Sequence, residues 1–345
     1  MKTRSFGVNH SGDAATLYTF ENKNGMIMEV TDFGATLYSL VVPTEQGPLD
    51  VVLGYDAPAG YEGPSGTFFG ATVGRNANRI CKGQFSLRDK LYKLDVNNGP
   101  NNLHSGLDFW SFRVWNVKNH TDNSITFSLH SPDGDQGYPG ALDMDVTYTL
   151  TEDNAVRIDY RGIPQAETIV NLTNHSYFNL NGHDSGDILG HTVWLDADSF
   201  TRADETSIPT GEILSVEGTP MDFRTPKTVG RDIEQDYEAL NFGMGYDHNW
   251  CLNNRRRFAK VASLAADKTA LAMDVYTDLP GVQVYTANFV NQEPGKAGAV
   301  YVRRSGICFE TQFYPDSVNH PNFPSPLRKA GEIYETSTEF RFRSK

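Results

Sequence analysis

Residues 26–43 read MIMEVTDFGATLYSLVVP, which is two apolar runs separated by Asp32-Phe33-Gly34. Both runs are rich in the β-branched and aromatic residues that pleated sheets favour. A turn at Glu45–Pro48 leads into a third run of this kind at Asp50–Tyr55. The stretch therefore predicts consecutive strands connected by short turns.

The same pattern of short runs and turn residues recurs along the chain. Helix signals are nearly absent, and only Val229–Leu240 could supply a turn or two, with Gly243 as a stop. Strands at this spacing without intervening helices predict an all-β fold, a large antiparallel β-sandwich. No internal repeat or long linker divides the chain, so we expect one domain over residues 1–345. The further predicted strands are Gln84–Leu91, Phe112–Val117, Ser124–His130, Leu142–Leu150, Val156–Arg161, Thr168–Phe178, Thr192–Leu195, Ala272–Thr277 and Val282–Phe289.

Composition restricts the kinds of partner. The formal net charge of −13 over 345 residues argues against nucleic acids and against anionic membrane surfaces. No apolar run approaches the roughly 18 residues of a membrane span, and residues 1–7 lack the apolar stretch of a signal peptide. Cys81, Cys251 and Cys308 have neither the pairing nor the spacing of a disulfide framework or a zinc site. We therefore expect a cytoplasmic protein.

One carboxylate lies in the middle of a predicted half-buried strand. Residues 306–312 read GICFETQ, and alternation turns Cys308, Glu310 and Gln312 toward the same face. A bare buried carboxylate is costly, so Glu310 needs a partner or a proton. These features mark Glu310 as a candidate base with a tuned pKa. The alternative is a glutamate on an edge strand that faces water.

A histidine lies in a strand whose polar face carries no lysine or glutamate. Residues 168–180 read TIVNLTNHSYFNL, which places Asn171, Thr173, His175 and Tyr177 on one face. Hydrogen-bonding groups of this kind are typical of a binding cleft, and the ordinary pKa of histidine suits proton transfer. His175 is therefore a candidate acid, with a buried structural histidine as the alternative.

Two stretches rich in glycine and asparagine present further polar groups. Residues 97–106 (NNGPNNLHSG) place His104 beside small residues that let a ligand approach closely. Residues 69–80 (FGATVGRNANRI) contain Arg75 and Arg79, whose guanidinium groups offer a fixed fork of donors for hydroxyls or a carboxylate. The alternatives are a histidine that caps a turn and arginines in surface ion pairs.

Two weaker candidates suit a sugar. Alternation sends Asp247 and His248 to opposite sides of their segment, while Gln283 and Tyr285 share a face. Carboxylates and amides can bind adjacent hydroxyls, and aromatic rings cover the C–H faces of a sugar. No two candidate ligands have the close spacing common in metal motifs, so we expect no metal site.

Taken together, these segments resemble the galactose mutarotase (aldose 1-epimerase) family. The resemblance implies a large antiparallel β-sandwich of the mutarotase type, an open sugar-binding cleft and no cofactor. It also implies Glu310 as base, His175 as acid, and His104 beside His175 at the ring oxygen. The matching segments occur in the family's order: Gly74–Ile80, Asn102–Gly106, Asp135–Gly140, Asn174–Leu180, Asp204–Gly211, Pro220–Arg224, Asp247–Asn249 and Glu310–Gln312.

The resemblance further implies which residues position the sugar hydroxyls, namely Arg79, Asn78, Asp247 and Gln283. One departure is Ser105, which stands where the family usually has glycine after the loop histidine. We expect its hydroxymethyl group to narrow the cleft or to add a hydrogen bond.

The implied reaction interconverts the α and β anomers of galactose, glucose or a related aldose. The C1 hydroxyl must lose a proton while the ring oxygen gains one, and an acid and a base each contribute on the order of 10²–10⁴-fold. We expect a Glu310 carboxylate and a His175 imidazolium. Their mutual field should raise the pKa of His175 and lower that of Glu310.

Other functions stay open on the sequence alone. A hexose-6-phosphate epimerase would need a cationic pocket, for which Arg255–Arg257 and Arg303–Arg304 are candidates. A non-catalytic carbohydrate-binding module would bind sugar without needing an acid–base pair, and metal-dependent hydrolysis is a third possibility. The sequence leaves open which aldose is preferred, and whether the chain is a monomer or a homodimer.

Overall fold

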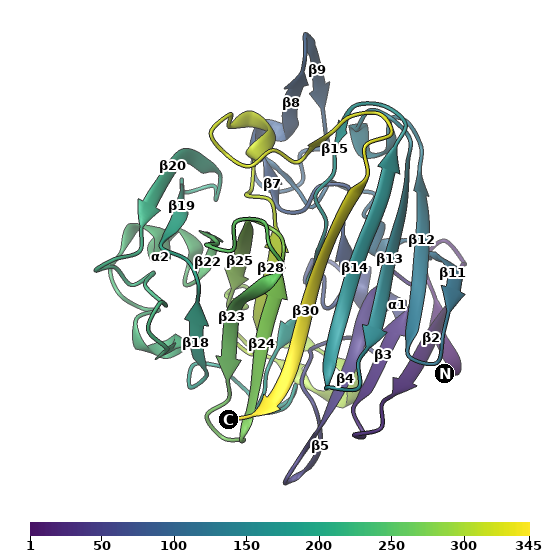
Figure 1. Ribbon diagram of the computed structural model, residues 1–345, viewed down its shortest axis with the longest axis vertical. Coiled ribbons are helices and arrows are strands. Elements are labelled where there is room, and N and C mark those ends of the chain that lie inside the picture. Colours follow the sequence, from purple (N-terminus) through teal and green to yellow (C-terminus); the bar gives the residue numbers. More distant parts are fainter.

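The computed structural model describes residues 1–345, and its strands pair in antiparallel fashion in every sheet (Figure 1). Three sheets of nine, six and five strands contain 20 of the 30 strands. This confirms the all-β sandwich expected from the sequence.

The nine-stranded sheet is built around the C-terminal strand. β30 is eleven residues long and pairs with β14 on one side and β24 on the other. The last segment of the chain therefore joins two groups of strands that are far apart in sequence. In spatial order the strands are β11 (Asn116–His120), β12 (Ser124–Ser131), β13 (Leu142–Leu150), β14 (Ala155–Pro164), β30 (Tyr334–Ser344), β24 (Leu271–Thr277), β23 (Ala259–Ala265), β18 (Thr192–Leu195) and β21 (Lys227–Thr228).

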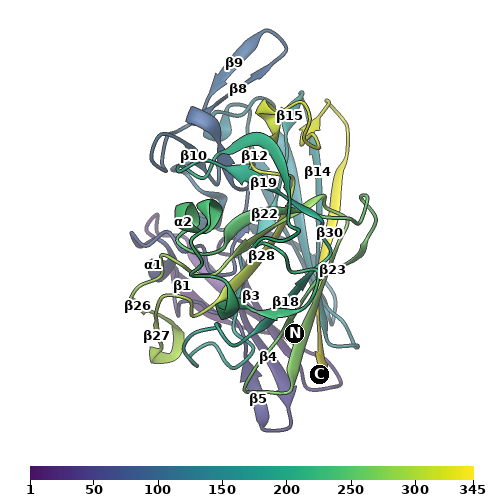
Figure 2. The same ribbon diagram turned by 90° about the vertical axis from the view of Figure 1, so that its left-hand side faces the viewer.

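The six-stranded sheet faces the nine-stranded one, as the side view shows for β22 and β28 against β14 and β30 (Figure 2). A hydrophobic core of 57 buried residues includes Trp250, Val282 and Phe309 from the smaller sheet, and Met273 and Phe340 from the larger one. In spatial order the six strands are β17 (Tyr177–Phe178), β28 (Ile307–Gln312), β25 (Gly281–Tyr285), β22 (Asp247–Cys251), β19 (Ser199–Ala203) and β20 (Pro209–Ser215).

The N-terminal residues form the five-stranded sheet, which contributes to the same core through Val30 and Leu40. A second, aromatic-rich cluster of 15 residues includes Tyr38, Tyr55 and Tyr177, so this sheet also supports one wall of the cavity described below. Its strands are β1 (Lys2–Val8), β2 (Ala14–Glu21), β3 (Ile27–Thr31), β4 (Thr36–Thr44) and β5 (Gly47–Asp50).

Short elements connect these sheets. The two-stranded pairs are β6 (Thr72–Val73) with β16 (Thr173–Asn174), β7 (Arg79–Ile80) with β10 (Asn102–Leu103), β8 (Gln84–Leu87) with β9 (Lys90–Lys93), β15 (Thr168–Ile169) with β29 (Leu327–Arg328), and β26 (Glu293–Pro294) with β27 (Val300–Tyr301). The α-helices are α1 (Pro58–Tyr61) and α2 (Glu238–Gly243). The 3₁₀ turns are Cys81–Gly83, Trp110–Phe112, Asp135–Gly137, Val229–Arg231, Lys296–Gly298 and Ser317–Asn319. No helix is long and apolar enough to cross a membrane.

Most predicted strands lie where the sequence placed them, with differences that have physical causes. Gln84–Leu91 is the start of a hairpin rather than one strand, because the chain reverses at Arg88, whose φ is 52°. Thr168–Phe178 is three separate two-residue strands in three different sheets. The predicted helical stretch Val229–Leu240 is confirmed in part, because it contains a 3₁₀ turn at Val229–Arg231 and the start of α2, which ends at Gly243 as expected. All three cysteines are free thiols.

The central position of β30 predicts a large effect of core truncation there. Phe340 is 1 % exposed, and its ring centroid lies 4.8 Å from that of Phe178. Phe340→Ala should lower the free energy of unfolding by about 3–5 kcal/mol in urea titrations. Phe258→Ala, at a ring 41 % exposed, is the matched control and should cost less than about 1 kcal/mol. Equal losses in the two variants would contradict this packing.

Candidate active site

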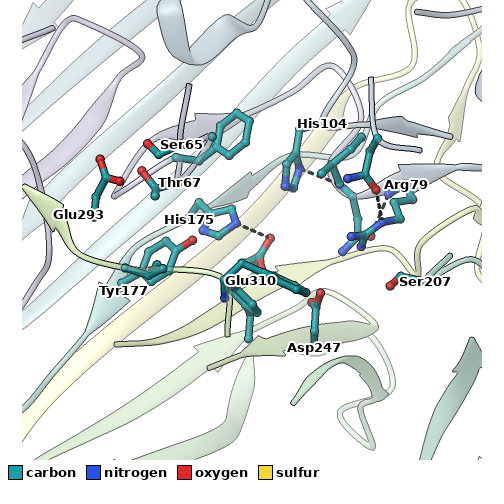
Figure 3. Close-up of a pocket in the computed structure, with 18 of the residues that line it drawn as sticks. Ser65, Thr67, Arg79, His104, His175, Tyr177, Ser207, Asp247, Glu293 and Glu310 are labelled. Atoms are coloured by element: carbon teal, nitrogen blue, oxygen red, sulfur yellow. Dashed lines mark hydrogen bonds and ion pairs between the residues drawn. The ribbon is translucent and has the colours of Figure 1, made fainter. Parts of the chain in front are cut away.

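A cavity of about 510 Å³ opens where the six-stranded sheet meets loops from the first third of the chain (Figure 3). This volume is in the range of pockets that bind small molecules. The predicted site residues that line it are Glu310, His175, His104, Arg79, Asn78 and Asp247.

Glu310 projects into this cavity from the centre of β28. Its strand is paired with β25, where Glu310 lies opposite Gln283, so the backbone is held on that side by the sheet. The residue is 2 % exposed, and its Oε2 atom has no hydrogen-bond partner within the protein. A buried carboxylate oxygen without a partner is costly. Such an atom indicates a position that a ligand hydroxyl completes.

His175 lies between β16 and β17, and the chain on both sides of it is fixed by hydrogen bonds. Its backbone N–H donates to the carbonyl of Ala71 at 2.9 Å, and its carbonyl accepts from Gly70 N–H at 2.9 Å. The imidazole Nε2 lies 3.6 Å from Glu310 Oε2. This separation is too long for a direct hydrogen bond. Both atoms are therefore available to a ligand between or beside them.

His104 reaches the same point from a tight loop. Its backbone is in the left-handed region, with φ of 54°, and so is that of Asn78, with φ of 63°. The two residues exchange hydrogen bonds: His104 N–H donates to the Asn78 carbonyl, and Asn78 N–H donates to His104 Nδ1, both at 3.1 Å. Because Nδ1 accepts this hydrogen bond, the neutral ring carries its own proton on Nε2. His104 can therefore donate one hydrogen bond into the cavity.

Burial, rather than mutual attraction, sets the proton affinities of the central pair. It lowers the pKa of His175 to about 4, although the Asp247 carboxylate opposes this shift. Burial and Asp247 together raise the pKa of Glu310 well above its ordinary value, with Arg79 acting in the opposite direction. The expectation that the pair would stabilise each other's charges is wrong, because desolvation outweighs their attraction.

The consequence is a single proton held by two groups. A carboxylic acid facing a neutral imidazole contains the same number of protons as a carboxylate facing an imidazolium. The pKa shifts favour the first arrangement. Burial likewise lowers the pKa of His104 well below its ordinary value. That residue is therefore a neutral donor rather than a second charged acid.

Polar groups gather at one end of the cavity. Arg79 Nε donates to Asn98 Oδ1 at 3.0 Å, and Asp247 Oδ1 accepts from Gln283 Nε2 at 2.8 Å. Gln283 is absent from the residues that line the cavity, and its predicted contact with the sugar stays a prediction. It is 3 % exposed and lies behind Asp247, which it orients.

Two other sequence interpretations need revision. Arg75 is fully buried and donates to the carbonyls of Pro139 and Gly140 and to the Ser131 hydroxyl. It therefore supports a loop rather than forming a surface ion pair. Ser105 does not narrow the cleft, because its hydroxyl accepts from Asn76 N–H at 2.8 Å and donates to the Asn76 carbonyl. Of the two effects expected for Ser105, the structure therefore shows the added hydrogen bonds.

Several lining residues escaped the sequence analysis. Ser65, Thr67 and Phe68 come from the loop after α1, and Phe289 and Glu293 come from the segment after β25. These residues lie in short segments between regular strands, so the alternation of buried and exposed residues did not mark them as part of a site. Ser207 also lines the cavity, and its inclusion in the segment Asp204–Gly211 was the one available indication.

The convergence of His104, His175 and Glu310 also has the composition of a metal site. One ligand atom from each lies within 4.8 Å of the others, although the residues are far apart in sequence. Two imidazoles and a carboxylate can bind a divalent transition metal. The same three groups suit proton transfer without a metal.

Comparisons with known proteins point to one family. The family model described as Aldose 1-epimerase matches residues 16–341. The chain is 43% identical to the galactose mutarotase of Bos taurus over 332 residues, 95% of each chain. It is 41% identical to the aldose 1-epimerase of Haemophilus influenzae over 332 residues, again 95% of each.

Solved structures of other proteins have the same fold. An aldose epimerase homologue from C. elegans superimposes with a TM-score of 0.87 at 29% identity, covering 96% of this chain and 99% of the other. A galactose 1-epimerase from Lactobacillus acidophilus gives a TM-score of 0.85 at 26% identity, covering 100% and 99%. The chain therefore belongs to the aldose 1-epimerase family.

Proposed function

We propose that this chain is a cofactor-independent isomerase that interconverts the α and β anomers of an aldose, with galactose and glucose as substrates. The observation that carries this proposal is the placement of Glu310 Oε2 and His175 Nε2, 3.6 Å apart, in the wall of one cavity. Relatives named galactose mutarotase at 42–44% identity support galactose as a substrate.

The reaction moves two protons without consuming any. Glu310, as a carboxylate, takes the proton of the C1 hydroxyl, while His175 Nε2–H gives a proton to the ring oxygen. The C1–O5 bond breaks and C1 becomes an aldehyde. Rotation about C1–C2 exposes the other carbonyl face, and the steps reverse. Each proton returns to its starting group, so acid and base are regenerated.

Burial stabilises the intermediate of this sequence. After ring opening, Glu310 is a carboxylic acid and His175 is neutral, which is the arrangement that the pKa shifts favour. The starting arrangement needs a carboxylate and an imidazolium. Hydroxyls of the bound sugar and the nearby Arg79 stabilise that carboxylate, and the His104 Nε2–H donor offers a further hydrogen bond near the reacting oxygens. The site therefore favours the open-chain form, whose formation is otherwise the difficult step.

The remaining polar groups would hold the sugar away from the bond that rotates. Asp247, Arg79 and Asn78 lie together at one end of the cavity. A carboxylate and a guanidinium can each bind adjacent hydroxyls in a bidentate way. Anchoring the ring carbons beyond C2 leaves C1 free to turn.

The cation clusters considered for a sugar phosphate lie elsewhere. Arg255–Arg257 and Arg303–Arg304 are absent from the cavity wall, where Arg79 is the only lysine or arginine. Arg304 instead pairs with Glu234 at 2.8 Å. A non-catalytic binding role is also less well supported, because sugar recognition does not require two buried groups with opposed pKa shifts.

We also propose that residues 1–345 form one domain and that the protein acts in the cytoplasm. The main core of 57 residues, to which all three large sheets contribute, and the position of β30 between β14 and β24 support the first proposal. Three free cysteines support the second, since reduced thiols are typical of that compartment.

Polarimetry on fresh α-galactose tests the proposed reaction. The protein should accelerate the approach to anomeric equilibrium, and it should do so equally after treatment with a chelator. Glu310→Gln and His175→Asn should each lower kcat at least about 100-fold, because each removes one of the two proton-transfer groups. Circular dichroism and melting temperature provide the check that both variants fold.

Each unfavourable outcome has a distinct meaning. A mild effect of Glu310→Gln on kcat would remove the base assignment. Loss of activity in chelator, restored by a divalent metal, would replace the proton-transfer account with a metal site at His104, His175 and Glu310. Comparing galactose with glucose 6-phosphate in the same assay separates the two epimerase functions.

Asp247 should act mainly in substrate binding. Asp247→Asn replaces charge-assisted hydrogen bonds to sugar hydroxyls by neutral ones, so KM should rise about tenfold with a smaller change in kcat. Asp122→Asn, in the exposed turn between β11 and β12, is the matched control and should leave KM unchanged. An unaltered KM in Asp247→Asn would show that this carboxylate does not touch the sugar.

A further inference from the structure

The proposed function fixes how the sugar lies in the cavity. The ring oxygen O5 is placed at His175 and the C1 hydroxyl at Glu310. Within a pyranose, C2 lies on the side of C1 away from O5, and C5 lies on the side of O5 away from C1. Figure 3 shows Asp247 and Arg79 beyond Glu310, and Ser65, Thr67 and Glu293 on the opposite side of His175. C2 and C3 therefore point toward Asp247, while C5 and its C6 substituent point toward Glu293.

A hydrogen-bonded group of four side chains forms this second end. Tyr55 is 3 % exposed and lies behind the wall. Its hydroxyl donates to Glu293 Oε1 at 2.6 Å and lies 3.0 Å from both Ser65 Oγ and Thr67 Oγ1. Ser65, Thr67 and Glu293 themselves line the cavity. Glu293 is half-buried and Thr67 is 7 % exposed, so the group is a built part of the wall.

The direction of these hydrogen bonds determines which ligand groups can bind at the Glu293 end of the cavity. A carboxylate can only accept, so the single Tyr55 proton is committed to Glu293. Burial raises the pKa of Tyr55 far above its ordinary value, which keeps that proton in place. The Ser65 and Thr67 hydroxyls then donate to the Tyr55 oxygen. All three lining side chains are left with acceptor oxygens facing the cavity, and a ligand here must supply the donor.

Charge acts in the same direction as hydrogen bonding. Glu293 carries a negative charge at this end, whereas Arg79, the only cation in the wall, lies at the opposite end. A hydroxymethyl group at C6 supplies an O–H donor and is neutral. A carboxylate or phosphate at C6 supplies only acceptors and a like charge, which is unfavourable in a partly desolvated site.

We propose that Glu293, supported by Tyr55, Ser65 and Thr67, recognises the C6 hydroxyl and excludes aldoses that carry an anion at C6, both uronic acids and 6-phosphates. This rests on the proposed function, because the epimerisation chemistry sets the orientation of the ring. Glu293 is a specificity determinant here and takes no part in proton transfer.

The test is the ratio of kcat/KM for galacturonate to that for galactose, measured by polarimetry at neutral pH. The wild type should strongly prefer galactose. Glu293→Gln keeps the size of the side chain and removes its charge. It should raise kcat/KM for galacturonate about tenfold, mainly through KM, while galactose changes by less than about threefold. Glu45→Gln, in the exposed turn between β4 and β5, is the control for net charge and should leave the ratio unchanged.

A second variant keeps the test decisive if Glu293→Gln does not fold. Asn291 is exposed, lines the cavity and precedes Glu293 by two residues, so Asn291→Asp adds a negative charge to the same segment and should lower the ratio further. A ratio unmoved by the folded variants, or a wild type that turns over both sugars equally, would overturn the C6 assignment while leaving the epimerase function intact. Failure of the wild type to accelerate galactose would instead remove the proposed function itself.

Discussion

The burial of Glu310 opposite His175 is the constraint on which the rest of the site depends. In water these two groups would ionise independently near their ordinary pKa values. Inside the cavity, burial raises the pKa of Glu310 and lowers that of His175 to about 4. The pair therefore holds one proton, and burial favours the arrangement of a carboxylic acid facing a neutral imidazole.

The fold makes this arrangement possible because hydrogen-bonded backbone fixes the positions of the buried polar side chains. Glu310 is in the middle of a strand, while His175 and His104 are in irregular segments held by backbone hydrogen bonds to Ala71 and Asn78. The large sheet that contains β28 fixes the position of Glu310. The short two-stranded elements change the direction of the chain and so bring segments that are distant in sequence together. The two ends of the cavity are then free to differ in charge, with Arg79 at one and Glu293 at the other.

Much of the fold could be read from the sequence, because half-buried strands alternate and turns have their own residues. The longest strand, β30, was nevertheless missed, although Tyr334, Thr336, Thr338, Phe340 and Phe342 alternate as buried residues. The charged residues between them made the segment look like an exposed one. The alternation of buried residues is understood only once β30 is seen to pair with β14 on one side and β24 on the other. Periodicity also predicted one strand over Thr168–Phe178, where the chain in fact crosses three sheets, since alternation does not report which partner each residue pairs with.

The sequence predicted which central residues share the cavity better than it predicted the residues at the periphery of the cavity. Motif order identified Glu310, His175 and His104, whereas the placement of Gln283 behind Asp247 and the role of the loop at Ser65 depend on packing between distant segments. The direction of the pKa shifts was also beyond the sequence, because desolvation depends on burial in three dimensions.

The pH dependence of kcat/KM for galactose tests the one-proton pair most directly. Below an acid limb near the pKa of about 4 of His175, the pair gains a second proton and Glu310 cannot act as base. Above an alkaline limb set by the raised pKa of Glu310, the pair loses its only proton and His175 cannot act as acid. The account predicts a bell-shaped profile with a plateau between these limbs. A rate that continues to rise with pH, with no alkaline limb, would contradict it.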